Sequence, residues 1–175
     1  MPDMMSNMSI SRRKVQLLVG ESQSLSGEIH IPEGQDLIGF LRTRRHFLNV
    51  TNVSGMEAVG GADVFPHTAV RVEELVWIRP VESDLALTTM VGPNARPREV
   101  RFILVGGRAL TVKMRISAEQ RLTDYFDSNT GFIPLYDVML DGAGRAVPEL
   151  ALNHRAILAI QELTDTDPKA SRGGS

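Results

Sequence analysis

The residues of this chain whose types and spacing best suit binding chemistry form a short basic cluster. It consists of Arg42, Arg44, Arg45 and His46, which place four cationic or titratable side chains within five positions. Such a cluster can contact phosphate groups or an acidic protein surface. The alternative is a solvated helix end, where cations complement the negative end of the helix dipole. The cluster is our first candidate for partner binding.

The only tryptophan is the second candidate for partner binding. Trp77 lies between Val76 and Ile78 in an alternating stretch, so its side chain is expected to point away from theirs. It either forms an exposed anchor for a partner or fills a seam between two parts of the molecule. The sequence leaves both interpretations open.

Residue patterns for catalysis or for metal binding are not recognisable. The 4 histidines are scattered without a close-spaced ligand pair, and the absence of cysteine excludes disulfides and thiolate sites. The adjacent carboxylates Glu73 and Glu74 would point to opposite faces of a strand, so they cannot readily share one substrate. No glycine-rich segment has the lysine and spacing of a phosphate-binding loop. We therefore expect a non-enzymatic function with no catalytic residues, no metal and no cofactor.

Composition narrows the class of protein further. The chain has 175 residues, of which 42% are hydrophobic and 23% charged, as in ordinary globular proteins. Its formal net charge of -2 lacks the basic excess of a generic nucleic-acid binder. No apolar segment approaches the roughly 20 residues that a membrane span needs. We expect a cytoplasmic protein that binds a protein partner or a second copy of itself, with RNA or a nucleotide as the alternative ligand.

An internal repeat predicts the elements that position these residues. Residues 25–53 match residues 110–138 without gaps, at a constant offset of 85 positions. The identical pairs are Leu25/Leu110, Ile31/Ile116, Gln35/Gln120, Leu37/Leu122, Phe47/Phe132 and Val53/Val138. Because apolar positions coincide at both strand-like and helix-like spacings, we interpret the chain as two copies of one module.

The basic cluster is confined to the first copy. In the second copy its positions are occupied by Asp127, Asn129, Thr130 and Gly131. A module that keeps its apolar spacing but changes its charged residues favours an electrostatic docking role for the first copy. The docking partner is either another protein or a second copy of this chain.

Each copy is predicted to contain four strands and one short helix. The strands of the first copy are expected at residues 15–19, 25–31, 47–53 and 70–78. Those of the second copy are expected at residues 100–105, 110–116, 132–138 and 151–160. An apolar triplet at helical spacing precedes the third strand of each copy, namely Leu37, Phe40 and Leu41, and then Leu122, Tyr125 and Phe126. A long loop is expected at residues 54–67.

The domain organisation follows from these elements. Residues 12–80 and 100–163 are expected to form two small β-rich modules. Residues 81–99 are expected to form a linker, because prolines and a glycine punctuate this segment. Residues 1–11 and 164–175 are expected to be disordered tails.

The strand pattern of each copy resembles that of the Sm-like small β-barrel. The third strand carries Phe47, Leu48, Asn49 and Val50 in the first copy, and Phe132, Ile133, Pro134 and Leu135 in the second. The chain also looks like uncharacterised bacterial domains with this strand order and an inserted helix. The resemblance implies a mainly β fold of two tandem small β-barrels, Sm-like or SH3-like, each with a short helix between strands 2 and 3. Sm-like proteins instead place a helix before the first strand, and their RNA-contacting loop residues have no match here.

Overall fold

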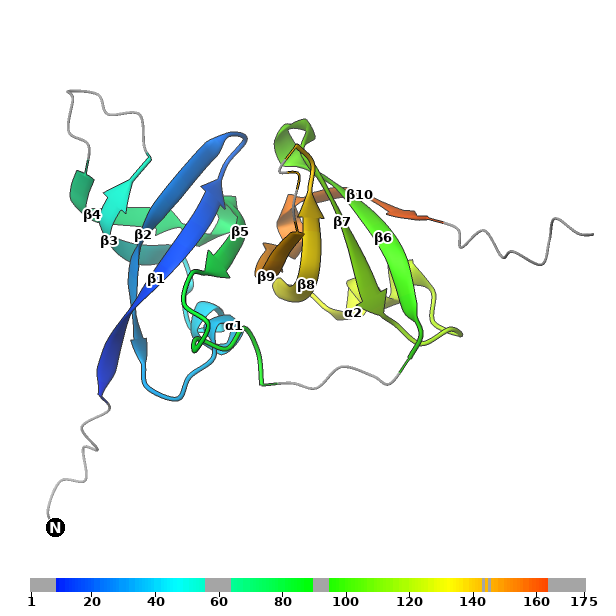
Figure 1. Cartoon of the computed structure of the whole chain (residues 1–175), viewed down its shortest axis with the longest axis horizontal. Helices are drawn as coiled ribbons and strands as arrows, with labels where there is room; N and C mark the ends of the chain where they lie inside the picture. Colours follow the sequence, from blue (N-terminus) through cyan, green and yellow to red (C-terminus); the bar gives the residue numbers. More distant parts are fainter. Residues whose placement is uncertain (1–8, 56–63, 90–94, 143, 145, 164–175) are drawn as a thin grey trace, which may run out of the picture.

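The computed structural model describes residues 9–55, 64–89, 95–142, 144 and 146–163, and this part of the chain is mainly β, as predicted (Figure 1). The N-terminal half contains β1 (Ile10–Val19), β2 (Gln23–Pro32), α1 (Leu37–Arg42), β3 (Phe47–Ser54), β4 (Val64–Arg71), the 3-10 turn η1 (Val72–Glu74) and β5 (Leu75–Pro80). The C-terminal half contains β6 (Pro97–Leu104), the 3-10 turn η2 (Val105–Gly107), β7 (Ala109–Arg115), α2 (Leu122–Ser128), β8 (Phe132–Leu140), β9 (Ala146–Asn153), the 3-10 turn η3 (His154–Ala156) and β10 (Ile157–Glu162).

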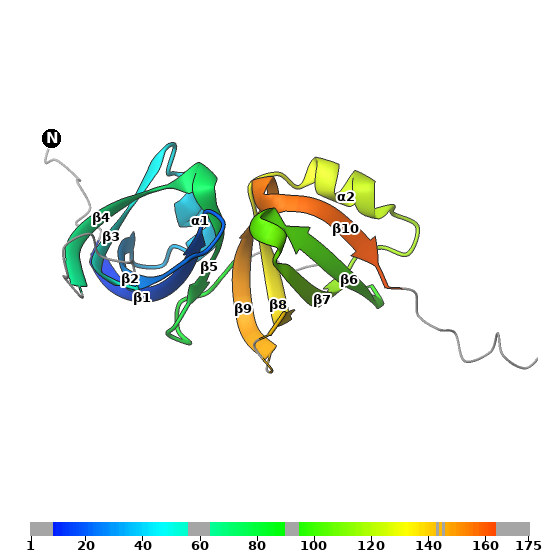
Figure 2. The same ribbon diagram turned by 90° about the horizontal axis from the view of Figure 1, so that it is seen from above.

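All ten strands belong to one antiparallel sheet, in the order β10-β6-β7-β8-β9-β5-β1-β2-β3-β4. Each half contributes five neighbouring strands, and the two sets meet where β5 pairs with β9. The sheet curls separately in each half (Figure 2) but does not close on itself. The two halves therefore share a continuous sheet. Within the described residues β4 and β10 each pair on one side only, and we call them the free edges.

The two halves share an unusual backbone detail as well as their order of elements. Asn52 and Asp137 both have a φ of 50°, and they are the non-glycine residues with positive φ in the described part of the chain. Asparagine and aspartate tolerate this left-handed conformation better than other side chains do. Each lies opposite a proline of the next strand, Pro66 on β4 or Pro148 on β9, where the ladder lacks a backbone donor. The two residues with positive φ are 85 positions apart and the two prolines are 82 positions apart. Like residues therefore recur in like positions, with an offset of 85 up to the third strand of each half and 82 from the fourth strand onward.

The strand expected at residues 70–78 is in fact two strands. β4 ends at Arg71, η1 follows, and β5 begins at Leu75. The sequence pattern concealed this turn because η1 buries Val72, which continues the alternation of apolar residues. The strand expected at residues 151–160 is divided by η3 in the same way, and β4 occupies the end of the loop expected at residues 54–67.

Two segment boundaries also differ from the expectation. β1 begins at Ile10, inside the expected tail, because Ile10 pairs with Pro32. β6 begins at Pro97, inside the expected linker, and pairs with β7 from its first residue. The remaining parts of the two expected tails, residues 1–8 and 164–175, lie outside the described residues.

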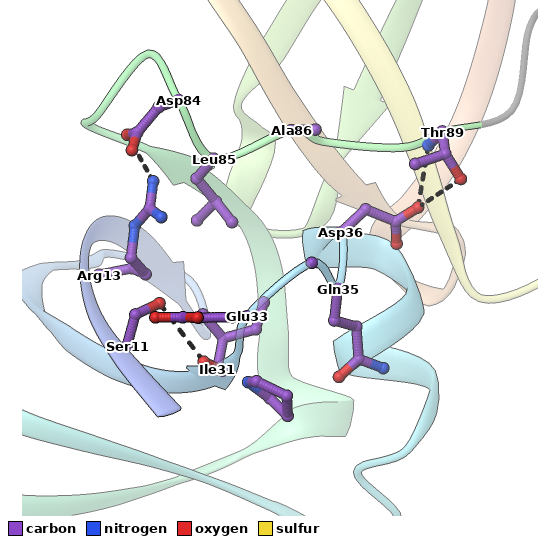
Figure 3. Close-up of a pocket in the computed structure, with 12 residues that line it drawn as sticks. Ser11, Arg13, Ile31, Glu33, Gln35, Asp36, Asp84, Leu85, Ala86 and Thr89 are labelled. Carbon is purple, nitrogen blue, oxygen red and sulfur yellow. Dashed lines mark hydrogen bonds and ion pairs between the residues drawn. The ribbon is translucent and has the colours of Figure 1, made fainter. Parts of the chain in front are cut away.

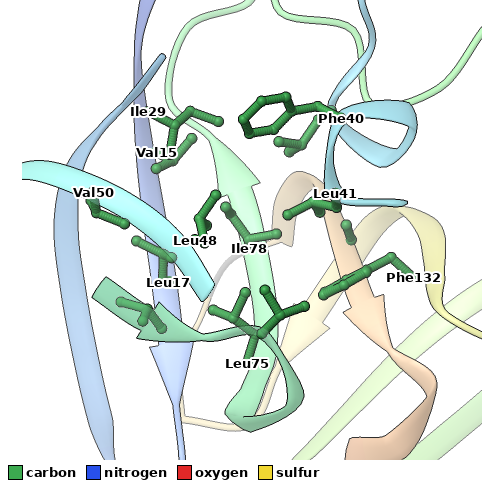
Figure 4. Close-up of a cluster of buried hydrophobic side chains, with 14 of the residues drawn as sticks. Val15, Leu17, Ile29, Phe40, Leu41, Leu48, Val50, Leu75, Ile78 and Phe132 are labelled. Atoms are coloured by element: carbon green, nitrogen blue, oxygen red, sulfur yellow. The ribbon is translucent and has the colours of Figure 1, made fainter. Parts of the chain in front are cut away.

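Two clusters of buried apolar side chains form the cores, and each includes residues of the other half. The N-terminal cluster contains Phe132 and Ala151 from the C-terminal half, and Figure 4 shows the Phe132 ring beside this cluster. The C-terminal cluster contains Leu18, Val76 and Trp77 from the N-terminal half. These five side chains and the β5–β9 ladder join the halves, and we call this contact the junction.

Candidate interaction surface

Trp77 belongs to the junction rather than to the exposed surface. Its side chain is 8% exposed, and its backbone pairs with Leu152 of β9. Of the two interpretations left open by the sequence, the structure therefore supports the seam between the halves. The prediction that Trp77 is an exposed anchor for a partner is therefore wrong, because a buried indole cannot contact a partner of the folded protein.

A buried asparagine fixes the backbone at the junction. Asn153, at the end of β9, is 4% exposed and is the buried polar residue of the described core. Its Nδ2 donates to the carbonyl oxygens of Val72 at 3.3 Å and Leu75 at 2.8 Å, both in the other half. Its Oδ1 accepts from the backbone N–H of Arg155 at 3.1 Å. One side chain thus connects η3 of one half to η1 of the other.

The basic cluster lies at the end of α1 and in the turn that leads into β3. Arg42, Arg44, Arg45 and His46 are all exposed. Helix α1 ends at Arg42, so the other three members of the cluster lie beyond the helix. Interaction with the helix dipole therefore accounts for Arg42 alone. Among the described residues, no ion pair within 4.0 Å uses a side chain of this cluster.

The structure adds another arginine and two contacts between arginines and aromatic rings to this cluster. Arg71 at the end of β4 pairs with Phe47 of β3, and its guanidinium carbon lies 5.1 Å from the centre of the Phe47 ring. The guanidinium carbon of Arg44 lies 4.7 Å from the centre of the Phe40 ring. We call the group of Arg42, Arg44, Arg45, His46 and Arg71, with the exposed Phe47, the basic surface. The Phe40 ring lies under Arg44 and is 4% exposed. Sequence analysis missed Arg71, because only the β3–β4 register brings it near the cluster.

The basic surface adjoins a free edge of the sheet. The backbone N–H of Val72, next to the end of β4, donates to the carbonyl oxygen of His46 at 2.9 Å. β4 pairs with β3 on one side only, and β10 pairs with β6 on one side only. Exposed edge strands offer unpaired backbone groups to another strand. Large apolar side chains are also exposed there, including Phe47 beside β4 and Leu158 on β10.

A hollow of the N-terminal half lies where the segment after β5 packs against α1 and β1 (Figure 3). The segment 81–89, expected as a linker, packs here with Leu85 and Leu87 in the core. Its Ala86 and Leu87 carbonyls accept from the first two N–H groups of α1 at 3.0 Å each. Arg13, which lines the hollow, is ion-paired with Glu82 and Asp84. Arg13, Glu82 and Asp84 are thus engaged with one another.

Asp36 completes this contact by capping α1. One carboxylate oxygen accepts from the Gly39 N–H at 2.6 Å, and the other accepts from the N–H and the hydroxyl of Thr89 at 2.9 and 3.1 Å. Burial alone would raise the pKa of Asp36. The hydrogen bonds from Thr89 and Gly39 and the charge of Arg42 together outweigh burial, so the pKa lies below its ordinary value. The ionised form is therefore the one that the fold stabilises.

Replacing the cap, as in Asp36→Ala, is expected to lower the free energy of unfolding by about 1–2 kcal/mol near neutral pH. Because the pKa of Asp36 is lower in the folded state, this contribution is present above the unfolded pKa and is lost as the pH falls through the folded pKa. Urea unfolding of both proteins over a range of pH measures this. The difference should shrink in acid. A difference that is constant with pH would contradict the role assigned to the charge.

The described residues contain no cluster of potential metal ligands and no helix that could span a membrane. No three His, Cys, Asp or Glu side chains among them are arranged to hold a metal ion. None of the helices in the described part of the chain is long and apolar enough to cross a membrane. Comparison with known proteins found no match to this chain among protein-family models, curated proteins or solved structures. The features of this chain that bear on its function are therefore the basic surface and the free edges.

Proposed function

We propose that this protein is a non-enzymatic interaction or assembly module of the cytoplasm. It acts through the edges of its sheet and through the basic surface, on a fold of two tandem small barrel-like modules of Sm-like or SH3-like type. The observation that carries this proposal is the position of the basic surface directly beside the free β4 edge. Backbone pairing and electrostatic attraction can then act on the same partner.

The two contributions have different physical roles. An added strand forms backbone hydrogen bonds with the edge and gains affinity from them. The cations of the basic surface increase the rate of encounter with an acidic partner and orient it. Since no described ion pair uses the side chains of the cluster, they are available to an external carboxylate.

The second candidate function is binding of RNA or a nucleotide. It is supported by Arg71 over the exposed Phe47 ring, because guanidinium groups and aromatic rings also provide stacking surfaces for bases. The guanidinium of Arg44 provides a second such surface, over the buried Phe40 ring. Phosphate binding by this surface would weaken steeply with salt. The net charge of -2 provides no general attraction for nucleic acid, so we rank this function second.

Photocrosslinking in cells tests the proposed function. A benzophenone amino acid is introduced at Ala69 on β4 or at Leu158 on β10, both of which are exposed. Lys113, exposed on the inner strand β7, is the matched control position. We expect covalent protein adducts from the two edge positions and few from Lys113. Nucleic acid in the adducts would favour the second candidate, and no protein adduct from either edge would contradict the proposal.

Charge reversal tests the contribution of the basic surface. Arg44→Glu with Arg45→Glu is expected to reduce the edge adducts by about tenfold or more, because the acidic partner is then repelled. The control variant Arg96→Glu with Lys113→Glu changes the net charge equally at exposed residues that belong to neither free edge. Equal adduct yields from both double variants would contradict a specific role for the cluster.

A further inference from the structure

We propose that the partner at these edges is a second copy of this chain, bound head to tail through β10 of one copy and β4 of the next. This inference rests on the proposed function and names its partner. The free edges are the counterparts of the two strands that already pair at the junction. In the order of elements, β10 corresponds to β5, and β4 corresponds to β9. The junction joins β5 to β9, and the sheet ends in β10 and β4.

The backbone of β10 matches that of β5 in detail. On β5, Leu75 and Trp77 are paired with consecutive residues of β1, so that Val76 is passed over. On β10, Ile157 and Ala159 are paired with consecutive residues of β6, so that Leu158 is passed over. Both strands thus have the same irregularity at the same point. The free edge of β10 therefore has the shape of a strand that accepts a neighbour in this molecule.

The side chains that are buried at the junction have exposed apolar counterparts at the free β10 edge. Val76 is 1% exposed because the C-terminal half covers it, whereas its counterpart Leu158 is 65% exposed. Trp77 is also buried at the junction, whereas its counterpart Ala159 is exposed. The β10 edge thus presents apolar surface of the kind that the junction removes from water.

The free β4 edge shows the same relation. Phe132, in the core across the junction, is 7% exposed, whereas its repeat counterpart Phe47 is 48% exposed. Ala151 is buried at the junction, whereas its counterpart Ala69 is exposed. Pairing of β10 with β4 would therefore bury Leu158, Ala159, Phe47 and Ala69 together, as the junction buries their counterparts.

Charges at the two edges are complementary in the same arrangement. In the junction, α1 contacts β8. The corresponding contact between copies brings α2, with Asp124 and Asp127, to the start of β3, beside Arg44 and Arg45. This arrangement explains why the cluster is basic in one half and has an aspartate in the other. Acidic α2 of one copy then faces the basic surface of the next.

The 3-10 turns also lie at the junction. Glu73 of η1 and Arg155 of η3 occupy corresponding positions, and within each chain they form an ion pair of 3.3 Å. The contact between copies that we propose is heterologous, because it joins β10 of one copy to β4 of the next. It therefore builds open chains or closed rings rather than isolated dimers.

Two edge-blocked variants test this inference with purified 175-residue protein. The β10-blocked variant carries Leu158→Asp and Ala159→Asp, and the β4-blocked variant carries Phe47→Asp and Ala69→Asp. These residues are exposed, so both variants should fold, which circular dichroism checks. We expect association of the unmodified protein, monomers from each variant alone, and a one-to-one complex from their mixture, because each retains one intact edge. Sedimentation velocity measures all three.

Three results would overturn the inference. In the first, the unmodified protein is a monomer at every soluble concentration. In the second, one blocked variant associates with itself. In the third, the mixture of the two blocked variants remains monomeric. If the edge crosslinks then contain a different protein, the second copy is excluded while the proposed function stands. If the edges give no protein crosslink at all, the proposed function itself fails.

A charge exchange in the same one-to-one complex tests the register. Arg44→Glu with Arg45→Glu in the β10-blocked variant is expected to weaken the complex by about tenfold or more. Asp124→Arg with Asp127→Arg in the β4-blocked variant should weaken it comparably, and combining the two should restore binding. If the combined variants bind no better than either changed variant alone, α2 of one copy does not contact the basic surface of the next.

Discussion

Phe132→Ala is expected to lower the free energy of unfolding by about 3–5 kcal/mol. Phe132 belongs to the C-terminal half, but its ring packs in the N-terminal core and is 7% exposed. Its removal takes apolar contacts from the junction and leaves a cavity between the halves. Guanidinium unfolding, followed by the fluorescence of Trp77 in the same junction, measures the change.

The repeat supplies a matched control for this prediction. Phe47→Ala removes the same side chain from the corresponding position, where it is 48% exposed. We expect a loss below about 1 kcal/mol in dilute solution, where copies are separated. Comparable losses for the two variants would contradict the assignment of Phe132 to the core across the junction.

Asn153→Ala is expected to lower the free energy of unfolding by about 2–3 kcal/mol. The variant removes donors from the buried carbonyl groups of Val72 and Leu75, and the acceptor for the Arg155 N–H. Buried polar groups without partners are costly, which makes this loss larger than that of an exposed hydrogen bond.

The control for Asn153 is Asn129, an exposed asparagine. Its Nδ2 donates to the carbonyl oxygen of Tyr125 at 2.7 Å. Asn129→Ala is expected to cost less than about 1 kcal/mol, because water can replace that bond. Thermal and urea unfolding of both variants provide the comparison. Equal costs would show that Asn153 does not hold η1 and η3 together as described.

The hydrophobic periodicity was sufficient to predict most elements of the fold. The triplet of Leu37, Phe40 and Leu41 lies in α1, and the triplet that begins at Leu122 lies in α2. Alternation placed β2, β3, β6, β7 and β8 within a few residues, whereas β1 begins at Ile10, well before the expected start at residue 15. It did not reveal η1 and η3, because a 3-10 turn that buries one apolar residue leaves the alternation intact.

Contacts between distant segments could not be predicted in the same way. The cluster from Arg42 to His46 is visible in the sequence, but the addition of Arg71 requires the β3–β4 register. The burial of Trp77 depends on the pairing of β5 with β9, which joins residues 73 to 75 positions apart. A sequence repeat predicts what each half contains, but it does not specify which of their strands pair.

Static light scattering over a range of protein concentrations, with absorbance at 260 and 280 nm, tests the central claim most directly. If the free edges and the basic surface bind a second copy, the mass should rise above that of one chain as the concentration increases. It should fall with salt, and the absorbance should be that of protein alone. A mass of one chain at every concentration, with a nuclease-sensitive signal at 260 nm, would contradict self-assembly and support the nucleic-acid function.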